Sequence, residues 1–174
     1  MKIAITGSSG LARAIADVMY DAEFTHFRIG EHVGYDFDVF INLAHQEYAQ
    51  VDLLDEWVTA WWDRPNCMIV NISSRAAFPN ISKGYMYAAQ KAALNHSADN
   101  YTFNSECRCR ITTLNLGLLE SELPSLSYYE VARILRLLII LPAHIEVPAM
   151  TLQHRFPYSI VQQAKANEKR HNIH

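Results

Sequence analysis

Cysteines are few in this sequence and long apolar runs are missing, and each absence excludes a class of protein. The three cysteines, Cys67, Cys107 and Cys109, form no zinc-binding spacing and are poorly placed to form a disulfide. The longest apolar run, residues 137–141, is far too short to cross a bilayer. We therefore expect no metal site, no membrane partner and a reducing, cytoplasmic location.

A large excess of charge of one sign is also absent. The formal net charge of the 174 residues is −3, and only one short basic block occurs, at residues 169–171. This pattern does not favour nucleic acid as a partner. Half of the residues are apolar and 19% are charged, which is the composition of a globular protein. We therefore expect one domain, residues 1–174, in which residues 151–174 form a tail.

A tyrosine and a lysine stand at helical spacing near the middle of the chain. Tyr87 and Lys91 are four residues apart within residues 85–101, so both lie on one face of the predicted helix. An ammonium beside a phenol favours the phenolate, so this pair can give or take a proton. Ser74 precedes Tyr87 by 13 residues, at the end of an apolar run, residues 68–72, that predicts a buried strand. A serine there can hold a substrate oxygen while the tyrosine moves its proton.

By itself, Tyr-x-x-x-Lys more often marks a packed ring and a solvated amine, but the serine and the strand before it favour a catalytic interpretation. Together these motifs resemble the short-chain dehydrogenase/reductase family, whose catalytic helix carries Tyr-x-x-x-Lys after a strand that ends in Asn-x-Ser-Ser. The matching sequences are IVNISS, residues 69–74, and YAAQKAALN, residues 87–95. The resemblance extends over residues 2–150.

This resemblance implies an enzyme that moves a hydride between NAD or NADP and a small alcohol or carbonyl substrate. Ser74 would hold the substrate oxygen and Tyr87 would transfer its proton. Lys91 would lower the pKa of the tyrosine and bind the hydroxyls of the nicotinamide ribose. In this mechanism the cofactor carries the hydride and the protein positions it.

A glycine turn follows the first predicted strand, residues 1–6. After the sequence TGSSG, apolar residues recur at helical spacing from Leu11 onward. Strand, glycine turn and helix occur in this order in dinucleotide sites, because the backbone must approach the pyrophosphate and aim helix N–H groups at it. The candidate cofactor-binding residues are Gly7, Ser8, Ser9, Gly10, Leu11 and Arg13. For Arg13, a solvated side chain is the alternative.

The choice between NAD and NADP depends on residues that follow the second predicted strand, residues 25–30. Glu31 comes 24 residues after Gly7. In dinucleotide folds a carboxylate about 20 residues beyond the glycines binds the adenosine ribose, which favours NAD over NADP. Arg28 and His32 nearby are the competing evidence for NADP.

Two segments are shorter than their counterparts in the family. The family's loop reads Thr-Gly-x-x-x-Gly-x-Gly, whereas this loop is one residue shorter and has Ala12 at the last glycine, so we expect a weaker hold on the phosphates. Only residues 31–35 then separate the second strand from DFDVFINLAH, residues 36–45, which is similar to the family's Asp-x-Leu-Val-Asn-Asn-Ala-Gly strand. The family's intervening helix, strand and helix have no room here, and we predict their deletion.

This third strand supplies further candidate cofactor contacts. Asn42 and Ala44 match the family's motif, and His45 stands where the family has glycine. For His45, a loop histidine without a role is the alternative. Later in the chain, Gly117 matches the glycine of the family's Pro-Gly after the strand predicted at residues 108–116, and it is the last cofactor candidate.

The helix predicted at residues 52–62 places Leu53, Leu54, Trp57 and Trp61 on one face. Tryptophans at this spacing are typical of a core. In the family this helix also packs against another subunit, so the aromatic stripe and the alanine-rich side of the next helix favour a homodimer or homotetramer. The family's catalytic asparagine lies in Val-Asn-Leu, and the match, Val-Asp-Leu, makes Asp52 its candidate substitute. An aspartate that caps the helix is the simpler alternative.

We expect a reduced Rossmann-type α/β fold. The doubly wound parallel sheet should have about six strands in the order 2-1-3-4-5-6, with helices on both faces. A helix at residues 128–140 and an edge strand at residues 145–150 complete it, and the short segment 118–127 leaves the pocket open. The cofactor should lie across the carboxyl ends of strands one and three.

Two other functions remain open. A sugar-nucleotide epimerase, dehydratase or reductase uses the same Ser/Tyr/Lys set, but such substrates need a larger C-terminal lobe than this chain has. A nucleotide-binding module without catalysis is favoured by the short glycine loop and the missing asparagine. The presence of all three of Ser74, Tyr87 and Lys91 argues against such a module.

Overall fold

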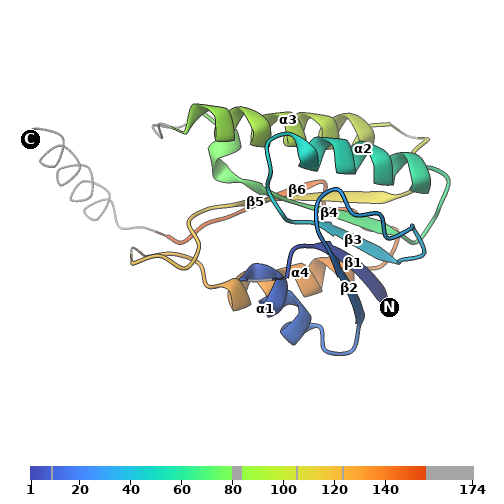
Figure 1. Cartoon of the computed structure of the whole chain (residues 1–174), viewed down its shortest axis with the longest axis horizontal. Coiled ribbons are helices and arrows are strands. Elements are labelled where there is room, and N and C mark those ends of the chain that lie inside the picture. The colour runs from blue at the N-terminus through green and yellow to red at the C-terminus, as the bar shows by residue number, and fades with distance from the viewer. Residues whose placement is uncertain (9, 80–83, 105, 123, 156–174) are drawn as a thin grey trace, which may run out of the picture.

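The computed structural model describes residues 1–155 except 9, 80–83, 105 and 123. Its centre is a six-stranded sheet in which every pair of neighbouring strands is parallel (Figure 1). In spatial order the strands are β2 (Glu23–Phe27), β1 (Lys2–Thr6), β3 (Val39–Asn42), β4 (Met68–Ser74), β5 (Arg110–Leu116) and β6 (Ala149–Leu152). The predicted fold class and strand order are confirmed.

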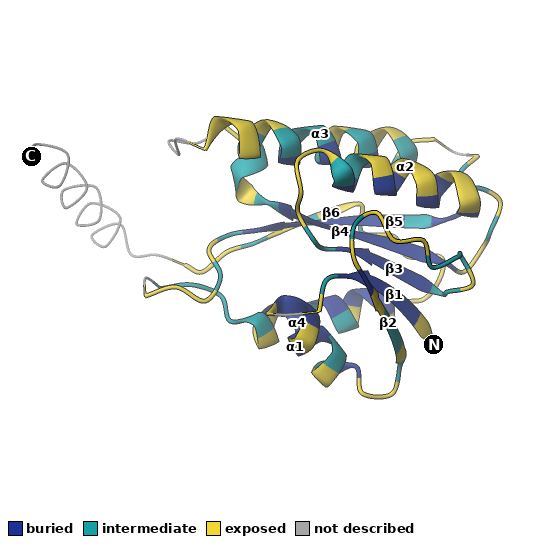
Figure 2. Cartoon of the chain, in the orientation of Figure 1, coloured by how far each residue is buried: buried dark blue, intermediate teal, exposed yellow. Residues whose placement is uncertain are grey.

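Helices cover both faces of the sheet. One face carries α1 (Leu11–Val18) and α4 (Tyr128–Ile139), and the other carries α2 (Ala49–Trp61) and α3 (Tyr85–Thr102) (Figure 1). The strands between these layers are almost wholly buried at the centre of the sheet (Figure 2). No helix in the described part of the chain combines the length and the hydrophobicity of a membrane span.

The boundaries of two edge strands differ from those predicted. The second strand is Glu23–Phe27 and not residues 25–30, because it pairs residue by residue with Lys2–Thr6 and the chain then turns at Gly30. The last strand is Ala149–Leu152 and not residues 145–150. Thr151 and Leu152, the first residues of the predicted tail, therefore belong to the sheet. Pro148, which has no N–H to donate, lies just before this strand.

No helix or strand lies between β2 and β3, so the predicted deletion is confirmed. The connection, residues 28–38, instead packs its own apolar side chains against the core on the α2 face. The carbonyl of Tyr35 in this connection accepts hydrogen bonds from Trp61 Nε1 at 3.0 Å and from Arg64 Nη1 at 2.8 Å. A fixed loop thus takes the place of the missing helices.

Aromatic side chains hold this loop and α2 against the sheet. The Trp57 indole stacks on Phe40 with ring centroids 4.1 Å apart, and Tyr35 and Trp61 meet Trp57 edge-on at 5.2 and 4.8 Å. Trp57 and Trp61 are only 2% and 1% exposed. The hypothesis that these two tryptophans form a subunit interface is therefore wrong, because both belong to the core of their own chain.

The alanine-rich side of α3 is the surface that remains for self-association. Ala88, Ala89 and Ala92 line a shallow hollow beside Phe78 and Tyr85. Tyr85 is 76% exposed and Phe78 is 43% exposed. Assembly into a homodimer or homotetramer stays a prediction that now rests on this surface alone.

We predict that Trp57→Ala lowers the free energy of unfolding by about 3–5 kcal/mol, because it opens a cavity between Phe40 and the residue 28–38 loop. Urea denaturation measures this change. Phe103→Ala is the matched control, since Phe103 is 84% exposed, and its effect should stay within about 0.5 kcal/mol. Equal effects of the two substitutions would mean that the aromatic cluster does not hold the loop.

Candidate functional site

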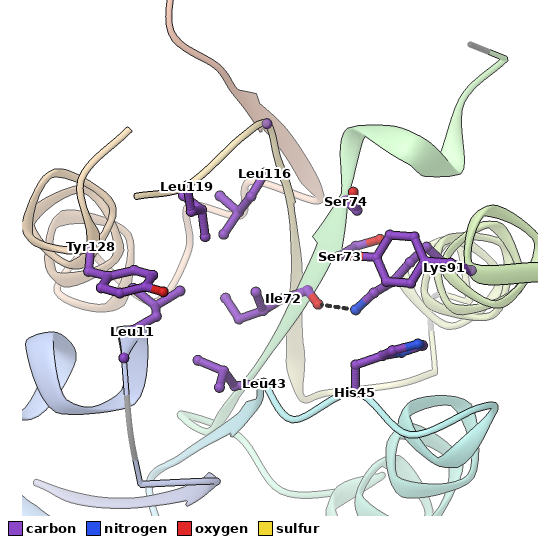
Figure 3. A pocket seen from close by; sticks show the side chains of 13 residues that line it. Leu11, Leu43, His45, Ile72, Ser73, Ser74, Lys91, Leu116, Leu119 and Tyr128 are labelled. Carbon is purple, nitrogen blue, oxygen red and sulfur yellow. Dashed lines mark hydrogen bonds between the residues drawn. The ribbon is translucent and has the colours of Figure 1, made fainter. Parts of the chain in front are cut away.

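A pocket of about 330 Å³ opens at the carboxyl ends of the central strands. This is the edge at which open parallel sheets bind ligands. Its lining residues are Gly10, Leu11, Leu43, His45, Ile72, Ser73, Ser74, Tyr87, Lys91, Leu116, Gly117, Leu119 and Tyr128. Figure 3 shows Leu11, Leu119 and Tyr128 on one side and His45, Lys91 and the two serines on the other. The pocket therefore has an apolar wall and a polar wall.

Lys91 is the buried charge of the polar wall. It comes from α3 and is only 3% exposed. Its Nζ donates hydrogen bonds to Gln50 Oε1 and to the Ile72 carbonyl, the latter at 2.9 Å (Figure 3). Burial lowers the pKa of Lys91 to about 8, because desolvation disfavours the ammonium. The side chain is thus an ammonium at neutral pH that loses its proton under mildly alkaline conditions.

Tyr87 lies one helical turn before Lys91, on the same face of α3, as its spacing predicts. Lys91 Nζ lies 5.7 Å from the centroid of the Tyr87 ring. The His45 ring meets Tyr87 edge-on at 4.9 Å. Tyr87 is 40% exposed, so its side chain contacts both the pocket and solvent. Two rings and one cation thus pack together at the pocket mouth.

His45 is a neutral polar group in this arrangement. Partial burial lowers its pKa, and the positive charge of Lys91 lowers it further. Hydrogen bonding with Gln50 and Gln90 opposes both effects without reversing them. The imidazole is therefore neutral at pH 7, and Lys91 carries the positive charge at this wall.

Two serine hydroxyls lie where β4 ends. Ser74 Oγ accepts a hydrogen bond of 3.1 Å from the Ala76 N–H and thereby begins a short 3₁₀ turn, Arg75–Ala77. Its own hydroxyl proton is left to donate into the pocket. Ser73 is 4% exposed, and its Oγ has no hydrogen-bond partner among the described residues.

Gln50 is a residue of this site that the sequence-based prediction missed. It is 2% exposed and comes from the first turn of α2. Its Nε2 donates to the carbonyls of Asn42 at 2.8 Å and Ile72 at 3.2 Å, while its Oε1 accepts from Lys91. Gln50 lies three residues before Leu53, on the same buried face of α2. A polar residue on that otherwise apolar face is the feature of the sequence that could have pointed to it.

Asp52 does not occupy the position proposed for it. It is exposed in the first turn of α2 and does not line the pocket. Gln50, two residues earlier, makes the contact with Lys91. Asp52 is not the helix cap either, since Tyr48 is the N-cap residue, but a carboxylate in a first helical turn is favourable.

Asn42, Glu31 and Arg13, predicted as cofactor contacts, are among the candidates that lie outside the pocket lining, as Gly7 also does. Asn42 is fully buried, and its Nδ2 donates to the Gln50 carbonyl and to Asn71 Oδ1, so it is a structural link between strands and α2. Glu31 is exposed and accepts a hydrogen bond of 2.8 Å from the Arg28 N–H. Arg13 is exposed on α1. For Arg13 the solvated side chain is the alternative that fits.

The glycine turn contributes backbone to the opposite end of the pocket. Gly7 and Gly10 have φ angles of +89° and +54°, which favour glycine, and a Cβ at Gly10 would approach the Tyr128 ring to 3.3 Å. The first hydrogen bond of α1 runs from the Ala14 N–H to the Gly10 carbonyl. The N–H groups of Leu11 and the next two residues are therefore outside the helical ladder and suited to an anion.

The remaining candidates surround this turn. Gly117 lines the pocket with Gly10 and Leu11, whereas Ser8 is exposed and does not line it. Ala44 lies behind the turn, where its N–H donates to Thr6 Oγ1 at 2.8 Å. Ser9 lies outside the described residues.

No protein-family model and no curated protein matches this sequence. Solved structures do resemble it. Serine dehydrogenase from Escherichia coli has a TM-score of 0.73 and 15% identity, over 88% of this chain and 97% of its own. The 3-alpha-hydroxysteroid dehydrogenase from Pseudomonas sp. B-0831 has a TM-score of 0.70 and 16% identity, over 87% and 94%. A short-chain dehydrogenase from Streptomyces avermitilis has a TM-score of 0.67 and 15% identity, over 99% and 96%.

At these identities the likeness concerns the fold. It agrees with the six-stranded parallel sheet and with the pocket at the carboxyl ends of its strands. The resemblance first suggested by the motifs around Ser74, Tyr87 and Lys91 therefore extends to the whole architecture. The protein has the fold of the short-chain dehydrogenases/reductases.

Proposed function

We propose that this protein is an NAD(P)-dependent oxidoreductase that interconverts a small alcohol and its carbonyl compound. The observation that carries the proposal is the convergence of Ser74, Tyr87 and Lys91 on a single pocket whose other end is the glycine turn. The similar structures support it, since they include a serine dehydrogenase complexed with NADP⁺ and a hydroxysteroid dehydrogenase complexed with NADH.

The pocket fits the dinucleotide at both ends. Backbone N–H groups at the start of α1, from Leu11 onward, would bind phosphate oxygens, and the φ of +54° at Gly10 favours glycine beside them. At the other end Lys91 uses two of its three N–H donors on protein acceptors, so one is left for a ribose hydroxyl. When bound, the nicotinamide ring supplies or accepts the hydride.

Ser74 and Tyr87 would handle the substrate oxygen. For reduction, the Ser74 hydroxyl binds the carbonyl oxygen and Tyr87 donates its proton to that oxygen as the carbon gains the hydride. The products are an alcohol and the oxidised nucleotide. Solvent then returns a proton to Tyr87, which is 40% exposed. The leucines and the isoleucine of the pocket limit water on the apolar side.

NAD is the proposed cofactor in preference to NADP. A carboxylate at Glu31 favours hydrogen bonding to a ribose and repels a 2′-phosphate. Glu31 lies four residues after the end of β2, and its carboxylate accepts a hydrogen bond from the Arg28 N–H, which holds it close to the carboxyl end of that strand. Arg28 and His32 are the residues that would favour NADP instead.

A nucleotide-binding module without catalysis is the second candidate. The observation that favours it is the approach of the Tyr128 ring to Gly10, which narrows the pocket at the shortened glycine turn. Such a module would bind NADH or NADPH but would not need the Tyr87 hydroxyl. Turnover by variants of Tyr87 therefore separates the two functions.

We expect Tyr87→Phe to lower turnover of a reducible aldehyde or ketone by about 10²- to 10⁴-fold, because the substituted ring cannot transfer a proton. Fluorescence of bound NADH or NADPH should show unchanged nucleotide affinity. Tyr85→Phe, on an exposed residue of the same helix, is the control and should keep full activity. Loss of activity in the control alone would mean that the wrong tyrosine has been assigned, and no loss in either would favour the binding module.

Nucleotide affinity should fall as the pH rises through about 8. The Lys91 pKa is about 8 in the free protein, and a nucleotide that accepts a hydrogen bond from the ammonium raises it. Binding then takes up a proton above pH 8, so the affinity falls by up to about tenfold per pH unit. Titrations with NADH and NADPH between about pH 6 and 10 measure this slope.

Lys91→Met is the control for the pH dependence, and it should bind nucleotide more weakly and without the slope. His45 does not produce a slope above pH 8, because burial lowers its pKa from the ordinary histidine range and the ring is already neutral there. An unchanged slope in Lys91→Met would assign the proton to another group.

We further expect Gln50 to set the pH at which Lys91 loses its proton. Gln50→Glu places a carboxylate beside the ammonium and should move the midpoint of the affinity profile to higher pH. Gln50→Leu removes the acceptor and should move it lower. Asn100→Asp adds the same charge as the first variant on an exposed part of α3, and it should leave the midpoint in place. Equal midpoints in all four proteins would remove Gln50 from this role.

A further inference from the structure

A second hollow begins at the residue that follows Ser74. It has a volume of about 570 Å³ and is lined by Arg75, Phe78, Pro79, Thr151 and Gln153. Arg75 and Phe78 come from the turn after β4, and Gln153 follows the last residue of β6. The hollow thus lies at the same edge of the sheet as the catalytic pocket, on the side towards β6.

The two hollows share a wall. Gly117 lines the catalytic pocket, and its N–H donates to the Leu152 carbonyl at 2.7 Å. A Cβ at Gly117 would lie only 3.0 Å from the Cβ of Gln153, which lines the second hollow. On the β4 side, Ser74 lines the catalytic pocket and the next residue, Arg75, lines the second hollow. The two hollows therefore adjoin at two places, Gly117 with Gln153 and Ser74 with Arg75, so one molecule that enters both is the arrangement that the proposal below requires.

The Arg75 guanidinium is oriented but has no negative partner in the described part of the chain. Its Nε donates to Gln153 Oε1, which fixes one edge of the group and leaves the four N–H donors of the two Nη atoms. The ion pairs among the described residues are Lys2–Asp36, His32–Glu56 and Arg136–Asp21. The residues after Gln153 are His154 and Arg155, so the adjacent sequence adds no negative charge.

We propose that Arg75 binds an anionic group of the substrate. The substrate class is then a hydroxy or oxo compound that carries a carboxylate or a phosphate a few bonds from the reacting carbon. A guanidinium pairs with either anion through two parallel hydrogen bonds. Phe78 and Pro79 cover the apolar part of the molecule between the two ends. This inference rests on the proposed oxidoreductase function and adds the selection of its substrate.

Matched pairs of compounds test the proposal. Acetoacetate is compared with methyl acetoacetate, and dihydroxyacetone phosphate with dihydroxyacetone, each with NADH and with NADPH. The anionic member of at least one pair should have a kcat/KM on the order of 10- to 100-fold higher, which is the usual worth of a charge-assisted hydrogen bond. The first pair reports a carboxylate and the second a phosphate.

Variants connect this selectivity with the guanidinium. Arg75→Ala should raise the KM of the anionic compound on the order of 10- to 100-fold and leave the neutral one unchanged. Arg75→Lys should restore part of the preference, because the charge returns without the fork. Arg133→Ala removes an equal charge from an exposed position on α4 and should change neither compound.

The outcomes separate this proposal from the proposed function. Equal or faster turnover of the neutral members, or a preference that survives in Arg75→Ala, overturns the role of Arg75 and leaves the oxidoreductase in place. Nucleotide binding without turnover of any of the four compounds overturns the anionic substrate class. Absence of NADH and NADPH binding removes both proposals together.

Discussion

The burial of one ammonium governs the arrangement of the pocket. A charge as buried as that of Lys91 must have acceptors, and here they are Gln50 Oε1 and the Ile72 carbonyl. The carbonyl is within reach because β3 ends at Asn42, opposite Asn71, while β4 continues to Ser74. Gln50 is in reach because Asn42 binds its backbone and its side chain. Two strand ends and two helices are thus fixed around a single nitrogen atom.

The parts of the fold that depend on local sequence could be predicted. The apolar run before Ser74 and the long helix that begins at Tyr85 are found where their patterns place them. The edge strand Glu23–Phe27 was misplaced because its burial is partial and its limits come from pairing with Lys2–Thr6. Pairing between segments far apart in the chain leaves little trace in either segment alone.

The same division applies to the site. The spacing of Ser74, Tyr87 and Lys91 is local, and the structure brings all three to one pocket. The bond between Gln50 and Lys91 joins residues 41 positions apart and depends on how α2 is rotated. Asp52 matched a family motif by sequence, but two residues further along a helix means a rotation of about 200°, which turns it to solvent. A motif match by sequence does not report how α2 is rotated when the connection before the helix is shorter than its counterpart in the family.

The segments that cover the two faces of the sheet are joined by hydrogen bonds of very different sequence separation. On the α2 face, the bond from Trp61 to Tyr35 spans 26 positions. On the other face, α4 reaches α1 through Arg136 to Val18 and Tyr129 to Asp17, which span 118 and 112 positions. Closing long loops costs more entropy and slows folding, which favours early formation of the α2 face. The apolar wall of the pocket, shared by Leu11 and Tyr128, would then be the last to assemble during folding, after the polar wall has its shape.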